Sequence, residues 1–445
     1  MSDNAVNSIS RRHFLQASVP IAGALTIEAS PSSRLFGSTS ASDRIRVGII
    51  GCGGRGTGAG QNCLKSSQGV EITAVADLFQ RQAEATAKKF NVSPDRTFSG
   101  FNCHEQLLKT DVDLVILAAP PGFRPAHFKA SIEAGKHVFM EKPVAVDPVG
   151  CRSIIEMSKV ATDKKLAVVS GTQRRHQTSY VEVMKRIHGG DIGELVGGQC
   201  YWIGGGIWYR KKEGVWATMS DLEWQCYNWY HWDWISGDQV VEQHIHNIDV
   251  INWCFNGPPA KILAMGGRQN RDREILPLVK DSPDFKRMGE TNGHPNILGN
   301  IYDHTSAELE YPNGARVVSF GGHRPNKSAT RVNERIVGTK GVSNCADTIT
   351  GEKPYTFSGD QTDPMILEHA DLIKSIRAGA PLNEGIRVAE STLTAIGIRM
   401  SAYTGREFSW TWLMNSSKLE IFPKDLKPGP GHFPPVAVPG FTELV

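Results

Sequence analysis

Two short motifs about 90 residues apart carry the clearest chemical signal in the chain. The first, Gly-Cys-Gly-Gly-Arg-Gly at 51–56, directly follows the apolar run 45–50. The second, Glu-Lys-Pro at 141–143, directly follows His-Val-Phe-Met at 137–140. A glycine string between a strand and a helix is typical of dinucleotide binding, and a lysine at the end of a later strand of the same sheet places an ammonium group nearby. Together the motifs indicate a nicotinamide enzyme that acts on alcohol carbons.

Each of the three spaced glycines has a physical role. Gly51 allows the tight turn after the strand, Gly53 lets the backbone approach the pyrophosphate, and Gly56 permits close packing of the helix. The N-terminus of that helix presents free N–H groups to the phosphates. The alternative is a glycine-rich turn that binds no nucleotide, and the flanking strand and helix argue against it. The candidate cofactor-binding residues are Gly51, Gly53, Gly54, Arg55, Gly56, Asp77, Pro120, Glu141 and Lys142.

Asp77 stands at the end of the next predicted strand, 24 residues after Gly53. A carboxylate at this place accepts hydrogen bonds from the ribose hydroxyls and repels a 2′-phosphate. We therefore expect NAD as the cofactor. NADP stays possible, because Arg81 lies close in the sequence and could weaken the preference.

A second constellation lies in 241–253, Val-Glu-Gln-His-Ile-His-Asn-Ile-Asp-Val-Ile-Asn-Trp. In a helix, Glu242, His246 and Asp249 fall at i, i+4 and i+7 on one face. In an extended chain, Glu242, His244 and His246 share a face with the spacing of a metal site. The apolar residues that follow favour a helix, at least from His246 onward. A third possibility is that the histidines are ordinary residues at a helix start.

These residue types suit the oxidation of a secondary alcohol, which moves a hydride to nicotinamide and removes the hydroxyl proton. His246 is the candidate proton acceptor, because the pKa of histidine lies near neutrality. Lys142 can hydrogen-bond the substrate oxygen and stabilise developing negative charge. Glu242 and Asp249 could orient the imidazole and fix its tautomer. The alternative for Lys142 is a solvated lysine on a loop, yet such loops border the ligand-binding edge of a parallel sheet.

An aromatic segment precedes this string, since seven of the ten tryptophans lie between residues 202 and 234. Aromatic faces suit the apolar face of a pyranose ring, and neighbouring polar groups could bind its hydroxyls. Core or interface packing is the preferred role for most of these rings, although one or two stacked on a sugar would be enough. Trp208, Tyr230 and His231 are the candidate substrate contacts here.

Elements that could position these residues follow from the hydrophobic pattern. Residues 43–170 alternate between strands and helices, which requires a doubly wound parallel sheet with helices on both faces. Residues 171–412 contain longer strand-like stretches separated by turns, which predicts a largely antiparallel sheet domain. Residues 413–445 form a Pro- and Gly-rich tail that is expected to wrap a surface or a neighbouring subunit. The predicted strands are 44–50, 70–77, 112–118, 137–140, 166–170, 195–203, 260–267, 304–311 and 315–320. The predicted helices are 58–66, 80–90, 125–134, 148–162, 180–188, 368–378 and 387–404.

Length, net charge, cysteine spacing and the N-terminal segment limit the classes of protein to which the chain can belong. The 445 residues are too many for one ordinary core, and a net charge of +3 argues against nucleic acid or a membrane surface as partner. Eight cysteines without a Cys-x-x-Cys pair signal no zinc site and no dense disulfide framework. Arg11 and Arg12 precede a short apolar stretch, so residues 1–42 are interpreted as a twin-arginine (Tat) export signal and linker. The Tat machinery is then a partner, the location is the periplasm or another exported site, and the short stretch provides no stable membrane anchor.

With these motifs the chain resembles the Gfo/Idh/MocA oxidoreductases, the group that includes glucose–fructose oxidoreductase and inositol dehydrogenase. The resemblance extends from Ile45 to Trp412. It implies that Lys142 contacts substrate hydroxyl and nicotinamide, and that His246 accepts the proton. The acidic residue four positions before is usually aspartate in the family and is Glu242 here.

The residue between that acid and the histidine is usually glycine in the family and is His244 here. These two departures leave open the proton path and a metal at Glu242, His244 and His246. The string 171–175 resembles the entry to the family's substrate domain, which makes Arg174 and Arg175 candidate substrate contacts. The resemblance also implies a homodimer or homotetramer.

The leading hypothesis is an exported NAD(P)-dependent oxidoreductase that acts on a sugar or polyol carbon. The alternative is an NAD-dependent glycosidase or lyase in which a keto sugar forms transiently and a tightly bound cofactor is recycled. A third possibility is a cofactor-binding protein without activity, and the presence of Lys142 and His246 argues against it.

Overall fold

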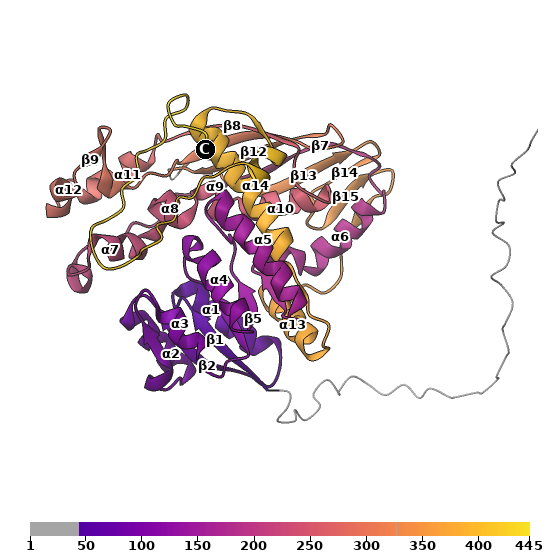
Figure 1. Cartoon of the computed structure of the whole chain (residues 1–445). Coiled ribbons are helices and arrows are strands. Elements are labelled where there is room, and N and C mark those ends of the chain that lie inside the picture. The colour runs from indigo at the N-terminus through magenta and orange to yellow at the C-terminus, as the bar shows by residue number, and fades with distance from the viewer. Residues whose placement is uncertain (1–43, 326) are drawn as a thin grey trace, which may run out of the picture. The chain divides into compact units, whose positions relative to one another are not determined.

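The computed structural model describes residues 44–325 and 327–445, which fold into a dinucleotide-type domain and a larger sheet domain (Figure 1). The twin-arginine signal predicted at 1–42 lies outside the described residues. Among the described residues, no helix is both long and apolar enough to cross a membrane.

The first domain contains six parallel strands in the order β3-β2-β1-β4-β5-β6. Runs of Val, Ile and Leu form the central strands because both faces of this sheet are buried under helices. The predicted doubly wound parallel sheet is confirmed. The strands are β1 (Ile45–Ile50), β2 (Val70–Asp77), β3 (Thr97–Ser99), β4 (Leu114–Leu117), β5 (His137–Met140) and β6 (Val168–Ser170).

The helices of this domain follow the strands directly. Helix α1 begins at Gly54, four residues before the predicted start at residue 58, so the last glycine of the motif lies in its first turn. The short helix α3 was not predicted, because its six residues are too few to show a helical period. The helices are α1 (Gly54–Ser66), α2 (Gln80–Phe90), α3 (Cys103–Leu108), α4 (Arg124–Glu133) and α5 (Pro148–Asp163).

The second domain is built on a nine-stranded sheet in the order β16-β15-β14-β13-β7-β12-β11-β8-β17. Only the β12–β7 pair is parallel within this sheet, so the predicted, largely antiparallel architecture is confirmed. The strands are β7 (Leu195–Gly204), β8 (Lys261–Gly267), β11 (His304–Glu310), β12 (Arg316–His323), β13 (Arg331–Gly338), β14 (Gly341–Ser343), β15 (Thr348–Gly351), β16 (Tyr355–Thr356) and β17 (Phe408–Ser409).

Helices cover one face of this sheet. The apolar residues of α10 and α14 pack with the inward residues of β8, β11 and β12 in one large core. The remaining α-helices of the described residues are α6 (Thr178–His188), α7 (Asp221–Tyr227), α8 (Asp233–Ser236), α9 (Gln239–Glu242), α10 (Ile245–Cys254), α11 (Arg271–Val279), α12 (Pro283–Arg287), α13 (Pro364–Arg377), α14 (Gly385–Thr404) and α15 (Trp410–Asn415). A strand pair is formed by β9 (Glu290–Thr291) and β10 (His294–Pro295).

Helix α13 returns to the first domain. Its Leu372 and Ile373 belong to the core that contains β1, and the ring of His369 lies 4.0 Å from that of Phe139 in β5. The sequence division at residue 170 places this helix with the second domain, whereas it packs on the dinucleotide-type sheet beside α1 (Figure 1).

Aromatic residues join the two domains in a separate apolar cluster. Trp224, Trp232 and Trp234 are buried there with Phe123, which lies between β4 and α4. The C-terminal tail reaches the same cluster, since the Phe422 ring lies 5.0 Å from that of Phe123. Packing is therefore the role of these three tryptophans, as preferred from the sequence, and the tail lies along the surface of its own chain.

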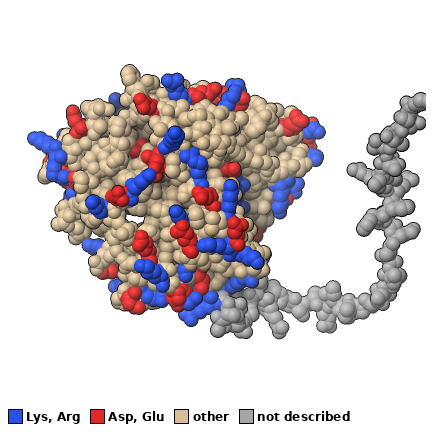
Figure 2. All heavy atoms as spheres, viewed as in Figure 1, with Lys and Arg blue, Asp and Glu red and all other residues tan. Residues whose placement is uncertain are grey.

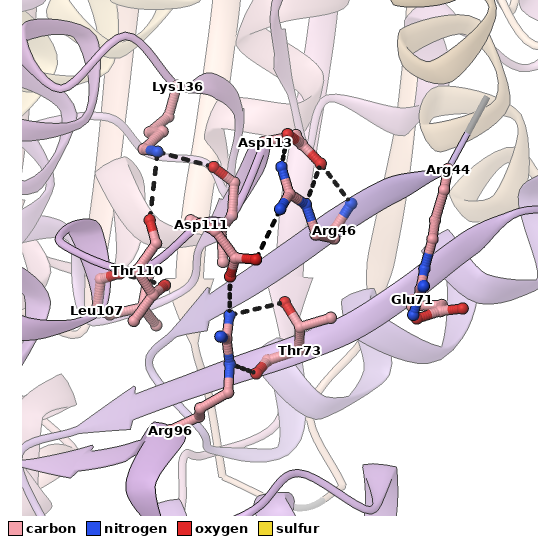
Figure 3. Close-up of polar contacts among 11 residues, drawn as sticks. Arg44, Arg46, Glu71, Thr73, Arg96, Leu107, Thr110, Asp111, Asp113 and Lys136 are labelled. Atoms are coloured by element: carbon pink, nitrogen blue, oxygen red, sulfur yellow. Dashed lines mark hydrogen bonds and ion pairs between the residues drawn. The ribbon is translucent and has the colours of Figure 1, made fainter. Parts of the chain in front are cut away.

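Ion pairs fix the edge of the parallel sheet at which its strands begin (Figure 3). Arg46 at the start of β1 contacts both carboxylate oxygens of Asp113, at 2.7 and 2.9 Å, in the turn before β4. Arg96 bridges the carbonyl of Thr73 and the carboxylate of Asp111, at 2.6 and 2.5 Å. These contacts hold the register of the strands, whose opposite ends carry the functional motifs. On the face shown in Figure 2, acidic and basic side chains are interspersed.

Candidate active site

The glycine loop has the geometry that its spacing predicts. Gly51 has φ +97°, and a Cβ there would lie 2.2 Å from the backbone nitrogen of Ala119. A Cβ on Gly56 would lie 1.8 Å from the carbonyl oxygen of Gly51, whereas nothing stands within 4 Å of the Cβ position of Gly53 or Gly54. The loop is therefore closed towards the protein and open towards a cleft of about 300 Å³. An open glycine backbone at the start of a helix suits a pyrophosphate.

Asp77 borders this cleft at the end of β2. Its carboxylate accepts hydrogen bonds from the backbone N–H of Cys52 at 2.7 Å and that of Phe79 at 2.8 Å. Burial raises the pKa of Asp77 to about 6, although these hydrogen bonds oppose the shift. The carboxylate thus connects the glycine loop with the end of β2, where a ribose would lie.

Arg55 and Glu141 form an ion pair on the same cleft, with 2.9 Å between Nε and Oε1. Glu141 is buried, so this pair connects the first turn of α1 to the end of β5. Pro120 follows β4 and also borders the cleft. Each predicted cofactor-binding residue except Gly56 lines the cleft, and Gly56 packs beneath the loop.

Lys142 is the point at which the two domains meet in the cleft. Its Nζ donates to the carbonyl oxygen of Glu242 at 2.7 Å and lies 3.2 Å from the Oε1 of the same residue. Burial raises the pKa of the Glu242 carboxyl, and the charge of Lys142 opposes that shift. Oε2 of Glu242 is buried without a hydrogen-bond partner among the described residues. The pair leaves one carboxylate oxygen free beside an ammonium group.

His246 lies in the first turn of α10, with its ring 5.6 Å from that of Trp202. Burial and the positive charge of Lys142 hold the pKa of His246 well below its usual range, so the imidazole is neutral at neutral pH. The helix predicted from His246 onward is present as α10, but Glu242 is not part of it, because α9 ends at Glu242 and α10 begins at Ile245. The side chains of Glu242 and His246 therefore do not stand one turn apart on one helix.

Asp249 faces a different set of partners. It accepts hydrogen bonds from Arg175 at 2.9 and 3.0 Å, from Arg387 at 3.2 Å and from the Ser391 hydroxyl at 2.8 Å. Burial would raise the pKa of Asp249, but Arg175 and Arg387 hold it below its usual range. Within the described residues Asp249 makes no hydrogen bond to His246. It anchors α10 rather than orienting the imidazole, and Arg175 is occupied by this anchor.

His244 points away from Lys142. Its Nε2 lies 2.7 Å from the Ser319 hydroxyl and 3.7 Å from the Cys200 thiol, on β12 and β7. Burial lowers the pKa of His244 to about 3. No group of three acidic, histidine or cysteine side chains among residues 44–325 and 327–445 is arranged to hold a metal ion. The histidines of the string thus face different surroundings, and Glu242, His244 and His246 do not converge.

The predicted substrate contacts divide into exposed and buried residues. Trp208 borders the cleft and is 37% exposed. Tyr230 and His231 are buried, and His231 donates from Nε2 to the carbonyl of Trp208 at 2.9 Å. Arg174 is paired with the buried carboxylate of Glu334. Of these candidates, only Trp208 is placed on the cleft.

Four further side chains border the cleft beside Trp208. Arg210 is one of the polar groups of the aromatic segment that were expected to bind hydroxyls, and Tyr227 and Trp229 belong to the rings assigned mainly to packing. Phe79, two residues after Asp77, was not predicted. The density of aromatic residues in 202–234 was the available signal, but it does not say which rings face a ligand.

Family profiles match both domains. The profile described as an oxidoreductase family with an NAD-binding Rossmann fold matches residues 45–170, and the profile of the GFO/IDH/MocA C-terminal domain matches residues 180–343. The chain belongs to the Gfo/Idh/MocA oxidoreductases. The predicted oxidoreductase family and its NAD-binding domain are confirmed.

Relatives of this family member include inositol dehydrogenases. The inositol 2-dehydrogenase of Salmonella typhimurium is 26% identical over 260 residues, which cover 58% of this chain and 67% of the relative. The corresponding enzyme of Pseudomonas savastanoi is 31% identical over 212 residues, which cover 48% of this chain and 55% of the relative.

Solved structures share the fold of both domains. The myo-inositol 2-dehydrogenase of Lactobacillus plantarum has a TM-score of 0.59 at 20% identity and covers 82% of this chain and 99% of its own. The WlbA dehydrogenase of Bordetella pertussis, solved with NADH and UDP-GlcNAcA, has a TM-score of 0.60 at 18% identity, with coverages of 82% and 98%.

Proposed function

We propose that this family member transfers a hydride between a sugar or polyol hydroxyl carbon and nicotinamide, with Lys142 and His246 at the reacting hydroxyl. The observation that carries the proposal is the Lys142–Glu242 contact on the cleft that the glycine loop also lines. Bound nicotinamide supplies the hydride acceptor or donor. All other chemistry at the hydroxyl falls to side chains of this chain.

Lys142 binds the substrate oxygen in this proposal. Its ammonium has three donors, of which two point at Glu242, so one is free for a hydroxyl. As the hydroxyl loses its proton, this donor stabilises the negative charge that develops on the oxygen, and departure of the hydride from carbon then leaves a neutral ketone. Glu242 keeps the ammonium in place and supplies one unpartnered carboxylate oxygen for a second hydroxyl.

His246 receives the hydroxyl proton, because its neutral imidazole near Lys142 has one unprotonated nitrogen that can accept it. Glu242 is the competing acceptor, since burial raises the pKa of its carboxyl. A hydroxyl bound to Lys142 is within reach of Glu242 by geometry. The variants His246→Ala and Glu242→Gln distinguish the two proton acceptors.

The decisive test removes the ammonium group. Lys142→Met should lower kcat by about 10²- to 10³-fold on the best substrate of a panel of inositols, pyranoses and glycosides, while NADH still binds. Lys353→Met, an exposed lysine paired with Asp191, is the matched control and should keep full activity. Full activity in Lys142→Met would contradict the proposal.

A second candidate function is a glycosidase or lyase that recycles its bound cofactor through a transient keto sugar. It is favoured by the aromatic rings that cover the cleft, because an enclosed cofactor suits repeated use. Product formed from a glycoside without net change in absorbance at 340 nm would support this candidate. Growth of NADH in proportion to product would support a simple dehydrogenase.

We also propose export through the Tat pathway, which is supported by Arg11 and Arg12 before a short apolar stretch. Residues 1–42 fused to a reporter should direct it to the periplasm, and replacement of both arginines by lysine should stop this. A reporter that stays in the cytoplasm with the intact segment would rule out this location.

Finally, we propose a homodimer or homotetramer that buries the open face of the large sheet. Leu263 and Met265 point outward from β8 and are 42% and 75% exposed. A stacked pair of Tyr201 and Phe320 lies on neighbouring strands of this sheet, with ring centres 5.5 Å apart. A second copy of the chain would cover this apolar surface.

A further inference from the structure

Residues 208–229, which we name the aromatic strap, follow β7 in the second domain. They nevertheless line the same cleft as the glycine loop and Asp77 of the first domain. The strap residues on the cleft are Trp208, Arg210, Cys226, Tyr227 and Trp229.

The strap contacts the first domain at the ribose end of the cleft. The ring of Phe79, two residues after Asp77, lies 5.8 Å from that of Trp216 and 5.9 Å from that of Tyr227, both edge to face. Trp216 and Tyr227 stack on each other at 4.4 Å. Phe79 and Tyr227 thus border the side of the cleft at which the adenosine half of a dinucleotide lies in this fold, and Trp216 packs against both rings.

Arg210 brings a positive charge to this cover. Its guanidinium lies 4.0 Å from the ring of Trp208 and 4.6 Å from that of Tyr227, and Nη1 donates to the Tyr227 carbonyl at 2.6 Å. Among the described residues it has no acidic partner. Because the half-buried Arg210 guanidinium lacks an acidic partner and borders the cleft, it is available to bind a phosphate oxygen of a ligand there.

The strap is held in place rather than loose. The indole of Trp224 donates to the Arg210 carbonyl at 3.0 Å, and the Tyr209 hydroxyl donates to the Ile297 carbonyl at 2.8 Å. Trp224 is fully buried in the aromatic cluster that joins the two domains. Arg210 and Tyr227 are therefore positioned before any ligand arrives, which lowers the entropic cost of binding one.

We propose that the aromatic strap clamps the bound dinucleotide, with Arg210 on a pyrophosphate oxygen and the rings of Phe79 and Tyr227, supported by Trp216, beside the adenosine. This inference rests on the NAD binding that underlies the proposed function and adds a second, non-Rossmann set of cofactor contacts. Release of the cofactor then requires the strap to open. The clamp makes release slow compared with turnover, as a recycled cofactor needs.

The direct test is the rate at which NADH leaves the protein, followed by stopped-flow fluorescence after mixing with excess ADP-ribose. Arg210→Gln and Tyr227→Ala should each raise this dissociation rate by about tenfold or more. Arg210→Lys keeps the positive charge, so its dissociation rate should lie between those of wild type and Arg210→Gln. Arg335→Gln, on β13 outside the cleft lining, is the matched control and should leave the rate unchanged.

Proteolysis gives a second readout that does not depend on fluorescence. Lys211 is exposed beside Arg210, so trypsin should cut the strap there, and NADH should slow the cut by about fivefold or more. NADH that binds but leaves Arg210→Gln and Tyr227→Ala as slowly as wild type, without protection of the strap, would overturn the clamp alone. Wild-type protein that binds no NADH would overturn the proposed function as well.

Discussion

At the scale of single residues, burial sets the charge of each group in the cleft. The Asp77 carboxyl has its pKa raised to about 6, the Glu242 carboxyl is also shifted upward, and the His246 imidazole is kept neutral. Each shift favours the form with less charge, as desolvation requires. A ligand that supplies hydroxyl donors reverses the shift at a carboxylate, and so couples ligand binding to proton release.

NAD affinity should therefore depend on pH through Asp77. The raised pKa means that the free protein holds a proton on Asp77 below about pH 6, and the ribose hydroxyls prefer the charged form. Affinity should fall by up to about tenfold for each pH unit below 6 and level off above it. Calorimetric titration between pH 5 and 8 measures this.

The same titration of Asp77→Asn isolates the carboxylate. This variant should bind NAD more weakly at pH 7 and lose the pH dependence, whereas Asp360→Asn, on the exposed surface, should behave as wild type. A wild-type affinity for NAD that is constant from pH 5 to 8 would show that the Asp77 carboxylate does not bind the ribose hydroxyls.

The proton acceptor can be identified by comparing His246→Ala with Glu242→Gln. If His246 accepts the proton, His246→Ala should lower kcat by about 10²- to 10⁴-fold with little change in NADH affinity. Glu242→Gln keeps the shape of the side chain and should mainly raise KM, because it loosens the hold on Lys142. The reverse pattern would assign the proton to Glu242.

At the scale of elements, the sequence predicts best where burial leaves a simple pattern. The strands β1, β2 and β5 were predicted within one residue, because runs such as Val-Glu-Ile-Thr-Ala-Val-Ala-Asp are buried on at least one face. Strand β13 was missed, because Arg-Val-Asn-Glu-Arg-Ile-Val-Gly shows no clean alternation: Glu334 is a charged residue among the inward positions and Val332 is exposed. The short elements β3 and α3 gave no period to detect.

The candidate site was predictable as far as local motifs reach. The glycine loop and Lys142 lie where strand ends must lie in a parallel sheet. The partners of Asp249 could not be predicted, since Arg175 and Arg387 stand 74 and 138 residues away. The sequence left open whether Glu242 belongs to the helix that contains His246, because the string fits both a helix and an extended chain, and the structure ends α9 at Glu242 and begins α10 at Ile245.

Helix α13 is also held by a contact whose strength depends on pH. His176, just after the 3₁₀ turn Gln173–Arg175, bonds Asp371 at 2.7 Å and lies 3.4 Å from Glu384. Burial alone would lower the pKa of His176, but these carboxylates raise it to about 9. The folded pKa exceeds the unfolded value near 6.5, so this stabilisation is full below about pH 6.5 and is lost as pH rises through 9.

His176→Gln should therefore lower the melting temperature most at acidic and neutral pH. A loss of about 1 kcal/mol, discounted for the half-exposed Asp371, corresponds to about 2 °C for a chain of this size. Scanning calorimetry at pH 6 and 10 should show the difference from wild type shrinking at the higher pH. His188→Gln, whose ring contacts the Trp253 carbonyl, is the control. An equal difference in melting temperature at pH 6 and pH 10 would exclude a contribution from the charge of His176.

At the scale of the whole molecule, the two domains use their sheets differently. The parallel sheet has helices on both faces, whereas the nine-stranded sheet has its helices on one face, which leaves the other face open (Figure 1). Ion pairs such as Arg316–Glu308 cover part of the open face, at 2.8 Å. Leu263 and Met265 on β8 are left exposed, and an apolar surface of this kind marks an interface.

Met265→Asp should separate the subunits if this face joins two copies. A carboxylate in the middle of the buried surface loses its water without gaining a partner, which costs several kcal/mol and is counted once in each copy. Light scattering of wild-type protein should give two or four times the chain mass of 48.7 kDa, and the variant should give the mass of one chain. Leu382→Asp, also an exposed leucine but outside this sheet, should leave the mass unchanged. A wild-type mass of one chain, or a Met265→Asp protein that keeps the wild-type mass, would contradict assembly through the open face.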